Sequence, residues 1–166
     1  MGTDESMMTH ALQLARTAES HGDVPVAAIV VKDDEIVGQS EPRTMVDGDP
    51  TAHAEVLALR NAAASLGAPY LAGCTMYGTF EPCPMCCGAI MNSGVGSLVL
   101  GGRFEGQDRT YGAYSVSTML DMAGAAGRIK LVEGVLRAEC EALFTPEKRD
   151  AWLDRMRGDS PGWGNQ

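Results

Sequence analysis

The sequence lacks a long hydrophobic run, and its first residues do not resemble a secretory signal. No stretch approaches the roughly 18 consecutive apolar residues that a membrane-spanning helix needs. The segment Met1–Met8 carries Asp4 and Glu5 but no lysine or arginine, whereas a secretory signal begins with basic residues. We therefore expect a cytoplasmic protein without membrane contacts.

Basic side chains are also scarce. Lysine and arginine total 13 against 22 aspartates and glutamates, which gives a net charge of −9. Proteins that bind nucleic acids draw much of their affinity from cations that neutralise phosphates. A broad phosphate-binding surface is therefore not expected. Only a local basic strip would make a nucleic acid such as tRNA a partner.

The five cysteines are an odd number, and three of them cluster at Cys83, Cys86 and Cys87. A disulfide framework in a short secreted chain uses an even number of cysteines. The pattern indicates a reducing compartment, with metal or thiol chemistry at the cluster. We expect Cys74, Cys87 and Cys140 to be buried thiols.

Length and composition predict one globular domain. The chain has 166 residues, of which 45% are hydrophobic and 21% charged, as in ordinary soluble proteins. We assign the domain to residues 1–157 and a flexible tail to residues 158–166.

Hydrophobic periodicity and turn residues predict helices alternating with strands. The expected helices span 5–20, 52–66, 83–92, 115–123, 135–144 and 146–156, the strands span 24–31, 35–39, 74–80, 97–100 and 129–132, and loops span 41–50 and 102–112. The first two strands form a hairpin around Asp33 and Asp34, and the later ones alternate with helices, which favours parallel pairing through crossovers. We predict an α/β fold, a three-layer α/β/α sandwich with a five-stranded mixed sheet.

Two short motifs have the spacing of a metal site. Cys83 and Cys86 of the motif Pro82-Cys83-Pro84-Met85-Cys86 are three residues apart, so at a helix start their sulfurs share one face, where the helix dipole favours thiolates. His53 begins an earlier helix, about one crossover away, at the same edge of the sheet. These residues supply one nitrogen and two sulfurs and leave a fourth position for water, as in catalytic zinc sites. Glu55 lies close enough to accept that water's proton.

The motif Cys83-Pro84-Met85-Cys86 has a second interpretation. A C-x-x-C sequence that follows a strand and opens a helix is also typical of thiol oxidoreductases. A zinc-binding thiol oxidoreductase that uses Cys83 and Cys86 is therefore the alternative from a different class. That alternative gives His53 and Glu55 no role.

The two motifs, extended to residues 49–55 (DPTAHAE) and 81–90 (EPCPMCCGAI), resemble the cytidine/deoxycytidylate deaminase superfamily over residues 5–145. They are most similar to its guanine deaminase and tRNA adenosine deaminase branch, and residues 134–144 (GVLRAECEALF) are more similar to the tRNA-acting members. The resemblance implies one zinc ion per chain, held by His53, Cys83 and Cys86 with a bound water or hydroxide, and Glu55 as the group that moves protons. It also implies a cytidine deaminase-like fold and a homodimer.

The resemblance further implies a substrate pocket lined by Val26 and by backbone near Ala54 and Glu81. Phe104, with Tyr111 and Tyr114, lies in the glycine-rich segment 102–112 or just after it, where the aromatic rings could stack on a planar substrate or pack the loop. Both possibilities stay open from the sequence.

Pro42 departs from the family pattern. Relatives carry an asparagine eleven residues before the zinc histidine, and it hydrogen-bonds the substrate; Pro42 stands there and offers no side-chain donor or acceptor. We therefore predict a zinc-dependent hydrolytic deaminase of a small amino-heterocycle, a free purine or pyrimidine base or nucleoside, with a triazine or modified base also compatible. The alternative within the class is a tRNA-specific adenosine deaminase that converts adenosine to inosine.

Overall fold

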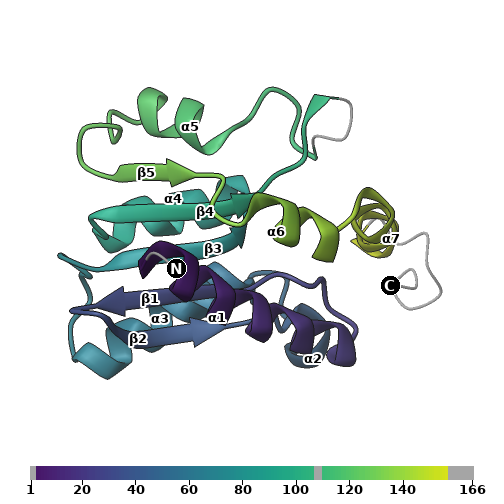
Figure 1. The fold of residues 1–166 in the computed structure, drawn as a ribbon, viewed down its shortest axis with the longest axis horizontal. Coiled ribbons are helices and arrows are strands. Elements are labelled where there is room, and N and C mark those ends of the chain that lie inside the picture. Colours follow the sequence, from purple (N-terminus) through teal and green to yellow (C-terminus); the bar gives the residue numbers. More distant parts are fainter. Residues whose placement is uncertain (1–2, 107–109, 157–166) are drawn as a thin grey trace.

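The computed structural model describes residues 3–106 and 110–156, and the tail expected at 158–166 lies outside the described residues. Figure 1 shows the elements in chain order. They are α1 (Thr3–Ala18), the short 3-10 helix η1 (Glu19–His21), β1 (Ala28–Lys32), β2 (Glu35–Ser40), α2 (Thr44–Asp47), α3 (Ala54–Leu66), β3 (Thr75–Phe80), α4 (Pro84–Ser93), β4 (Ser97–Gly102), α5 (Val116–Met122), β5 (Lys130–Glu133), α6 (Arg137–Leu143) and α7 (Pro146–Met156). None of the helices that the structure describes has the length and apolar character needed to cross a bilayer.

The five strands form one mixed sheet in the order β2-β1-β3-β4-β5. β1 pairs antiparallel with β2 and with β3, whereas β3, β4 and β5 run parallel. In consequence the carboxyl ends of β2, β3, β4 and β5 and the start of β1 lie at one edge of the sheet. Ligands of open α/β sheets bind at such an edge.

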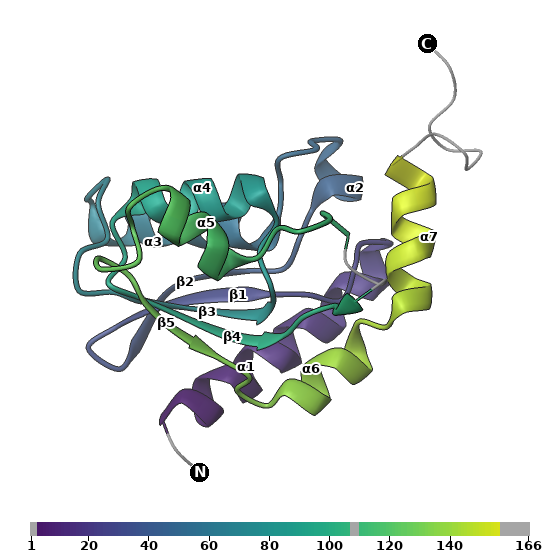
Figure 2. The same ribbon diagram turned by 90° about the horizontal axis from the view of Figure 1, so that it is seen from above.

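Helices cover both faces of the sheet, which confirms the predicted three layers. Figure 2 shows α3, α4 and α5 on one face and α1 and α6 on the other. Residues of β1 alternate between the two sides: Ala28 and Val30 pack in the core under α3, α4 and α5, whereas Ile29 and Val31 pack against α1. The sheet is therefore buried on both sides, as a parallel sheet with crossover helices requires.

The expected strand over 24–31 is shorter, because β1 begins at Ala28. Pro25 has no N–H for the strand ladder, so the chain before Ala27 leaves the sheet. Ala27 pairs instead with Thr79, whose hydroxyl accepts a hydrogen bond from the Ala27 N–H at 2.9 Å. The four residues 24–27 thus form an irregular segment at the edge where the strands end.

The expected loop 41–50 contains the short helix α2, which sequence patterns did not predict. The buried carboxylate of Asp23 accepts hydrogen bonds from the Thr44 hydroxyl and from the Met45 N–H, at 3.2 Å for the latter. The helix therefore depends on a residue far away in the sequence, and local patterns contain no sign of it.

The expected helix 52–66 begins two residues later, at Ala54, with His53 as its N-cap in an extended conformation. Asp49 does not cap this helix and accepts hydrogen bonds from the N–H and the hydroxyl of Thr51, at 2.8 and 2.7 Å. Asp49 thus stabilises a turn before the helix. His53 follows this turn as the first residue of the helix start, at the edge of the sheet where the strands end. The helix expected at 135–144 is also shorter, since Leu136 has φ +50 and α6 begins at Arg137.

Two glycines allow helices to approach the sheet closely. A Cβ added at Gly38 of β2 would lie 2.4 Å from the Ala58 carbonyl oxygen and 2.5 Å from the Ala62 nitrogen, both in α3. A Cβ at Gly101 of β4 would lie 2.3 Å from the Cys140 sulfur in α6. The present distances between α3 and β2 and between α6 and β4 therefore require glycine at these two positions.

We expect Gly38→Ala to lower the free energy of unfolding by about 1–3 kcal/mol, because the added methyl group meets helix backbone that cannot rotate away. Urea denaturation measures this change. The matched control is Gly127→Ala, where an added Cβ meets nothing within 4 Å, and its effect should stay within about 0.5 kcal/mol. Equal shifts in the two variants would contradict this account of the packing of β2 against α3.

Candidate active site

Two helix N-termini bring three metal-binding side chains together at the edge of the sheet. His53 is the N-cap of α3 and Cys83 the N-cap of α4, both with extended backbone, and Pro84 occupies the first turn of α4. A proline suits that place because it has no N–H to leave unpaired. Cys86, in the first turn of α4, points to the same side as Cys83.

The three side chains have the separations of a zinc ligand set. His53 Nδ1 lies 3.6 Å from Cys83 Sγ and 3.5 Å from Cys86 Sγ. Zn–N distances of ~2.0–2.1 Å and Zn–S distances of ~2.3 Å at tetrahedral angles place such a nitrogen and sulfur about 3.5–3.6 Å apart. All three ligand atoms lie within 4.8 Å of one another, and among residues 3–106 and 110–156 no other cluster of this kind occurs. The donor set thus fits zinc with one open position.

The two cysteine side chains share a hydrogen bond. This hydrogen bond from the Cys86 thiol and a second one with His53 lower the pKa of Cys83 below its ordinary value. The Cys86 N–H, 3.5 Å from Cys83 Sγ at the start of α4, also favours the thiolate. The same sharing, together with burial, raises the pKa of Cys86. The site therefore presents a thiolate beside an imidazole, as a divalent cation requires.

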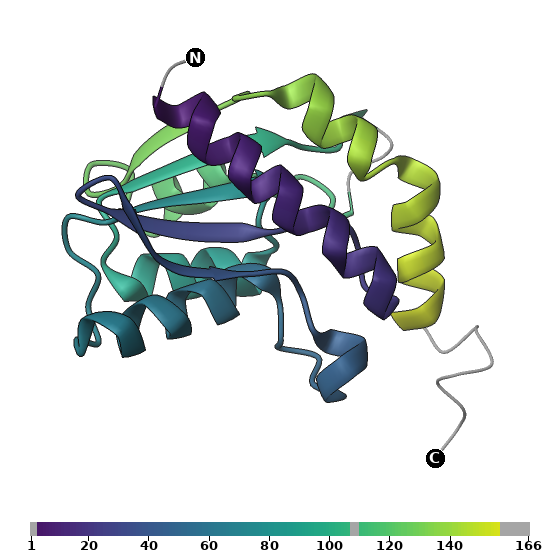
Figure 3. The same cartoon turned by 60° about the horizontal axis from the view of Figure 1, so that its bottom comes forward.

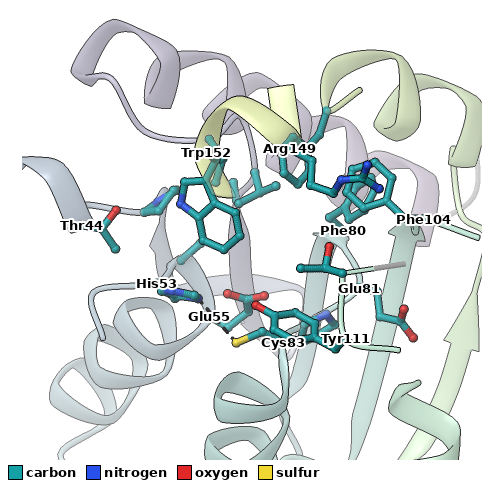
Figure 4. A pocket seen from close by; sticks show the side chains of 18 of the residues that line it. Thr44, His53, Glu55, Phe80, Glu81, Cys83, Phe104, Tyr111, Arg149 and Trp152 are labelled. Atoms are coloured by element: carbon teal, nitrogen blue, oxygen red, sulfur yellow. Dashed lines mark hydrogen bonds between the residues drawn. The ribbon is translucent and has the colours of Figure 1, made fainter. Parts of the chain in front are cut away.

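Glu55 extends from the first turn of α3 into the space beside this cluster (Figure 4). Burial raises the pKa of its carboxyl above the ordinary value, and the charge of Cys83 raises it further. A carboxyl whose pKa is raised exchanges protons closer to neutral pH, as a general acid and base must. Glu55 is not one of the three clustered ligands, so it can act on a molecule bound between them and the cavity.

The cluster lies at the floor of a cavity with about 880 Å³ of space between atoms, part of it open solvent. The five residues predicted from the sequence to bind substrate all line the cavity: Val26, Pro42, Ala54, Glu81 and Phe104. They come from the segment before β1, the loop after β2, the start of α3 and the ends of β3 and β4. The cavity therefore lies at the edge of the sheet, where these segments meet.

Glu81 lines the cavity and also holds the start of α5 in place beside it. Its carboxylate accepts a hydrogen bond from the Val116 N–H at 3.0 Å, at the start of α5. Tyr114 donates a hydrogen bond to the Pro82 carbonyl oxygen at 2.7 Å. These contacts hold the segment before α5 against the turn that carries Cys83.

Phe104 both packs the loop and faces the cavity, so neither of the two alternatives for the aromatic residues is complete by itself. Its ring centroid lies 4.6 Å from that of Phe80 and 5.1 Å from that of Phe144. Tyr111 also lines the cavity, and its ring meets that of Tyr114 edge to face. An aromatic wall thus stands above the metal cluster.

Several lining residues could not be found from sequence patterns. Thr44 belongs to the unexpected helix α2, and Arg149 and Trp152 belong to α7. The one available signal was Trp152, a large aromatic residue in an otherwise charged helix. Because α7 begins more than fifty residues after the second motif, nothing in the sequence placed it beside the motifs.

Comparison with known proteins agrees with this geometry. Residues 1–102 match the family model described as the cytidine and deoxycytidylate deaminase zinc-binding region. The tRNA-specific adenosine deaminase of Haemophilus influenzae is 41% identical over 152 residues, which cover 89% of this chain and 86% of that protein. The tRNA(Ile)-lysidine synthase of Deinococcus radiodurans is 50% identical over 95 residues, which cover 57% of this chain and 16% of the synthase. The chain thus spans only a small part of this second relative.

Solved structures show the same fold. One from a study of A-to-I editing by tRNA:A34 deaminases has a TM-score of 0.73 and 28% identity, and the match covers 82% of this chain and 97% of that one. The guanine deaminase of Nitrosomonas europaea has a TM-score of 0.70 and 29% identity, over 89% of this chain and 84% of that one. The family model spans both motifs and more than half of the sequence. The chain belongs to the cytidine and deoxycytidylate deaminase family.

Proposed function

We propose that this deaminase acts on a small planar amino-heterocycle, a free purine or pyrimidine base or its nucleoside, and releases the amino group as ammonia. The observation that carries the proposal is the cavity itself. Its walls carry apolar side chains and six aromatic ones above a polar floor, and small-molecule sites typically combine such walls with a few polar groups. Aromatic faces favour planar rings. A triazine or a modified base would meet the same surroundings.

The ligands of the proposed zinc ion are His53, Cys83 and Cys86, one ion per chain. Zinc in such a three-ligand site supplies a nucleophilic hydroxide from water near neutral pH. The assignment is supported by the nitrogen–sulfur separations of 3.5 and 3.6 Å and by the lowered pKa of Cys83.

Glu55 is the proposed proton carrier of the reaction. It accepts a proton from the attacking water as oxygen adds to the carbon that bears the amino group. It then donates that proton to the amino nitrogen, so that the C–N bond breaks and ammonia leaves with its electron pair. The raised pKa of Glu55 supports both roles, since the carboxyl must alternate between its two protonation states.

A tRNA-specific adenosine deaminase is the second candidate, and the names of relatives favour it. The Haemophilus influenzae enzyme is 41% identical over most of the chain. Two observations favour a small substrate instead. The net charge is −9, and Pro42 provides no polar side-chain group at the cavity wall. A homodimer, which the family resemblance implies, stays a prediction.

We expect the purified protein to hold one zinc ion per chain, and His53→Ala or Cys83→Ser to reduce the zinc content to near zero in metal analysis. Cys74→Ala, which changes a buried thiol outside the cluster, should leave the zinc content unchanged. Zinc should remain bound under a mild oxidant. A reversible disulfide between Cys83 and Cys86 in the native protein would instead support the thiol oxidoreductase.

We expect Glu55→Gln to lower the rate of ammonia release by about 100-fold or more while the zinc content stays at one per chain, because the amide cannot carry the proton. Glu35→Gln, which makes the same change at an exposed position of β2, should retain full activity. Activity of the Glu55 variant within a few-fold of the unchanged protein would disprove the role of this carboxylate.

We expect ammonia release in a screen of amino-purines, amino-pyrimidines and amino-triazines, tested with and without ribose. A parallel gel-shift measurement with tRNA at physiological salt should show no complex, because the acidic surface repels phosphates. Inosine formation in tRNA without turnover of any free heterocycle would favour the second candidate.

A further inference from the structure

α7 lies over the cavity, opposite the metal cluster (Figure 4). Trp152 projects from it toward His53, with ring centroids 6.3 Å apart and planes at 67°. One turn earlier, the guanidinium of Arg149 lies 4.8 Å from the centre of the Phe104 ring, and the residue is only 7% exposed. We call Arg149 and Trp152 the α7 cover. The cavity is thus closed on this side by a helix that belongs to neither motif.

Basic side chains of α7 fasten the helix to the rest of the chain. Lys148 forms an ion pair with Glu19 of η1, with Nζ and Oε1 2.5 Å apart, and donates a hydrogen bond to the Leu143 carbonyl oxygen. Arg155 donates a hydrogen bond to the Gly22 carbonyl oxygen at 2.6 Å. Figure 3 shows the result, with α7 lying beside the carboxyl end of α1.

These contacts bear on the choice of substrate. Lys148 and Arg155 are cations of α7, and the described contacts of both are with groups of the chain itself. Trp152 stands above the floor of the cavity, where its ring narrows the space available to any substituent of a bound heterocycle. A planar ring placed beneath it gains an aromatic contact.

We infer that Trp152 is a specificity-determining residue, which contacts the ring of the bound heterocycle and favours free bases over nucleosides and RNA. This inference rests on the proposed function, because it concerns the substrate of the same site. The ring of Trp152, and not the presence of α7 alone, makes the selection.

The first test compares Trp152→Ala and Trp152→Phe with the unchanged protein, using adenine, guanine and cytosine and their ribonucleosides. For a base that is deaminated, Trp152→Ala should raise KM about tenfold with a smaller change in kcat, because a stacking contact is lost. The ratio of kcat/KM for the free base to that for its nucleoside should fall at least tenfold. Trp152→Phe keeps an aromatic ring and should restore most of the ratio.

Asp154→Ala is the control on the same helix, because Asp154 is exposed and lies outside the cavity lining. It should leave KM and the ratio unchanged. An unchanged ratio in Trp152→Ala, with the unchanged protein active on free bases, would overturn the inference and leave the proposed function standing. Activity of the unchanged protein on tRNA alone would overturn both.

Binding can be followed without turnover, since the chain has two tryptophans, Trp152 and Trp163. The variant Glu55→Gln, Trp163→Phe keeps Trp152 as its single tryptophan and should bind heterocycles without releasing ammonia. Adding the base that the unchanged enzyme deaminates should change its fluorescence emission over the same concentrations as KM. A constant emission despite binding measured by calorimetry would show that Trp152 does not contact the ring, which overturns the inference.

Discussion

The site depends on the convergence of two helix N-termini at one edge of a mixed sheet. The turn after β3 gives Cys83 and Cys86 to the start of α4, and the start of α3 gives His53, so atoms 30 and 33 residues apart in sequence lie 3.6 and 3.5 Å apart. The start of α4 directs the Cys86 N–H toward Cys83 Sγ, which favours thiolate over thiol. Because the sheet fixes the positions of α3 and α4, the ligand geometry depends on the packing of these two helices and on the extended residues at their starts.

In the proposed function, the chemistry and the choice of substrate come from different parts of the fold. The proposed zinc ligands and the proposed proton carrier Glu55 belong to the α3 and α4 layer, whereas the aromatic residues of the cavity wall lie near strand ends, before α5 and in α7. Pro42 and Thr44 also line the cavity, and neither they nor Trp152 has a role in the proposed hydrolysis.

Sequence patterns predicted the residues at the floor of the cavity but missed several residues of its walls. His53, Glu55, Cys83 and Cys86 lie in short motifs with fixed spacing, and the five strands follow from hydrophobic runs, so both could be predicted. The helix α2 was missed because its stability comes from Asp23, twenty-one residues before Thr44, through a buried contact. Trp152 was missed because the position of α7 depends on the ion pair between Lys148 and Glu19 and on the contact between Arg149 and Phe104, which join distant segments.

The close contact between Gly101 of β4 and Cys140 of α6 links the sheet to the α7 cover. α6 rests on Gly101 through Cys140 and passes into α7 after only two intervening residues, Phe144 and Thr145. A methyl group on Gly101 would push α6 outward, and α7 would move with it. The clearance between the Trp152 indole and the His53 imidazole therefore depends on the missing side chain of Gly101, a residue that does not itself line the cavity.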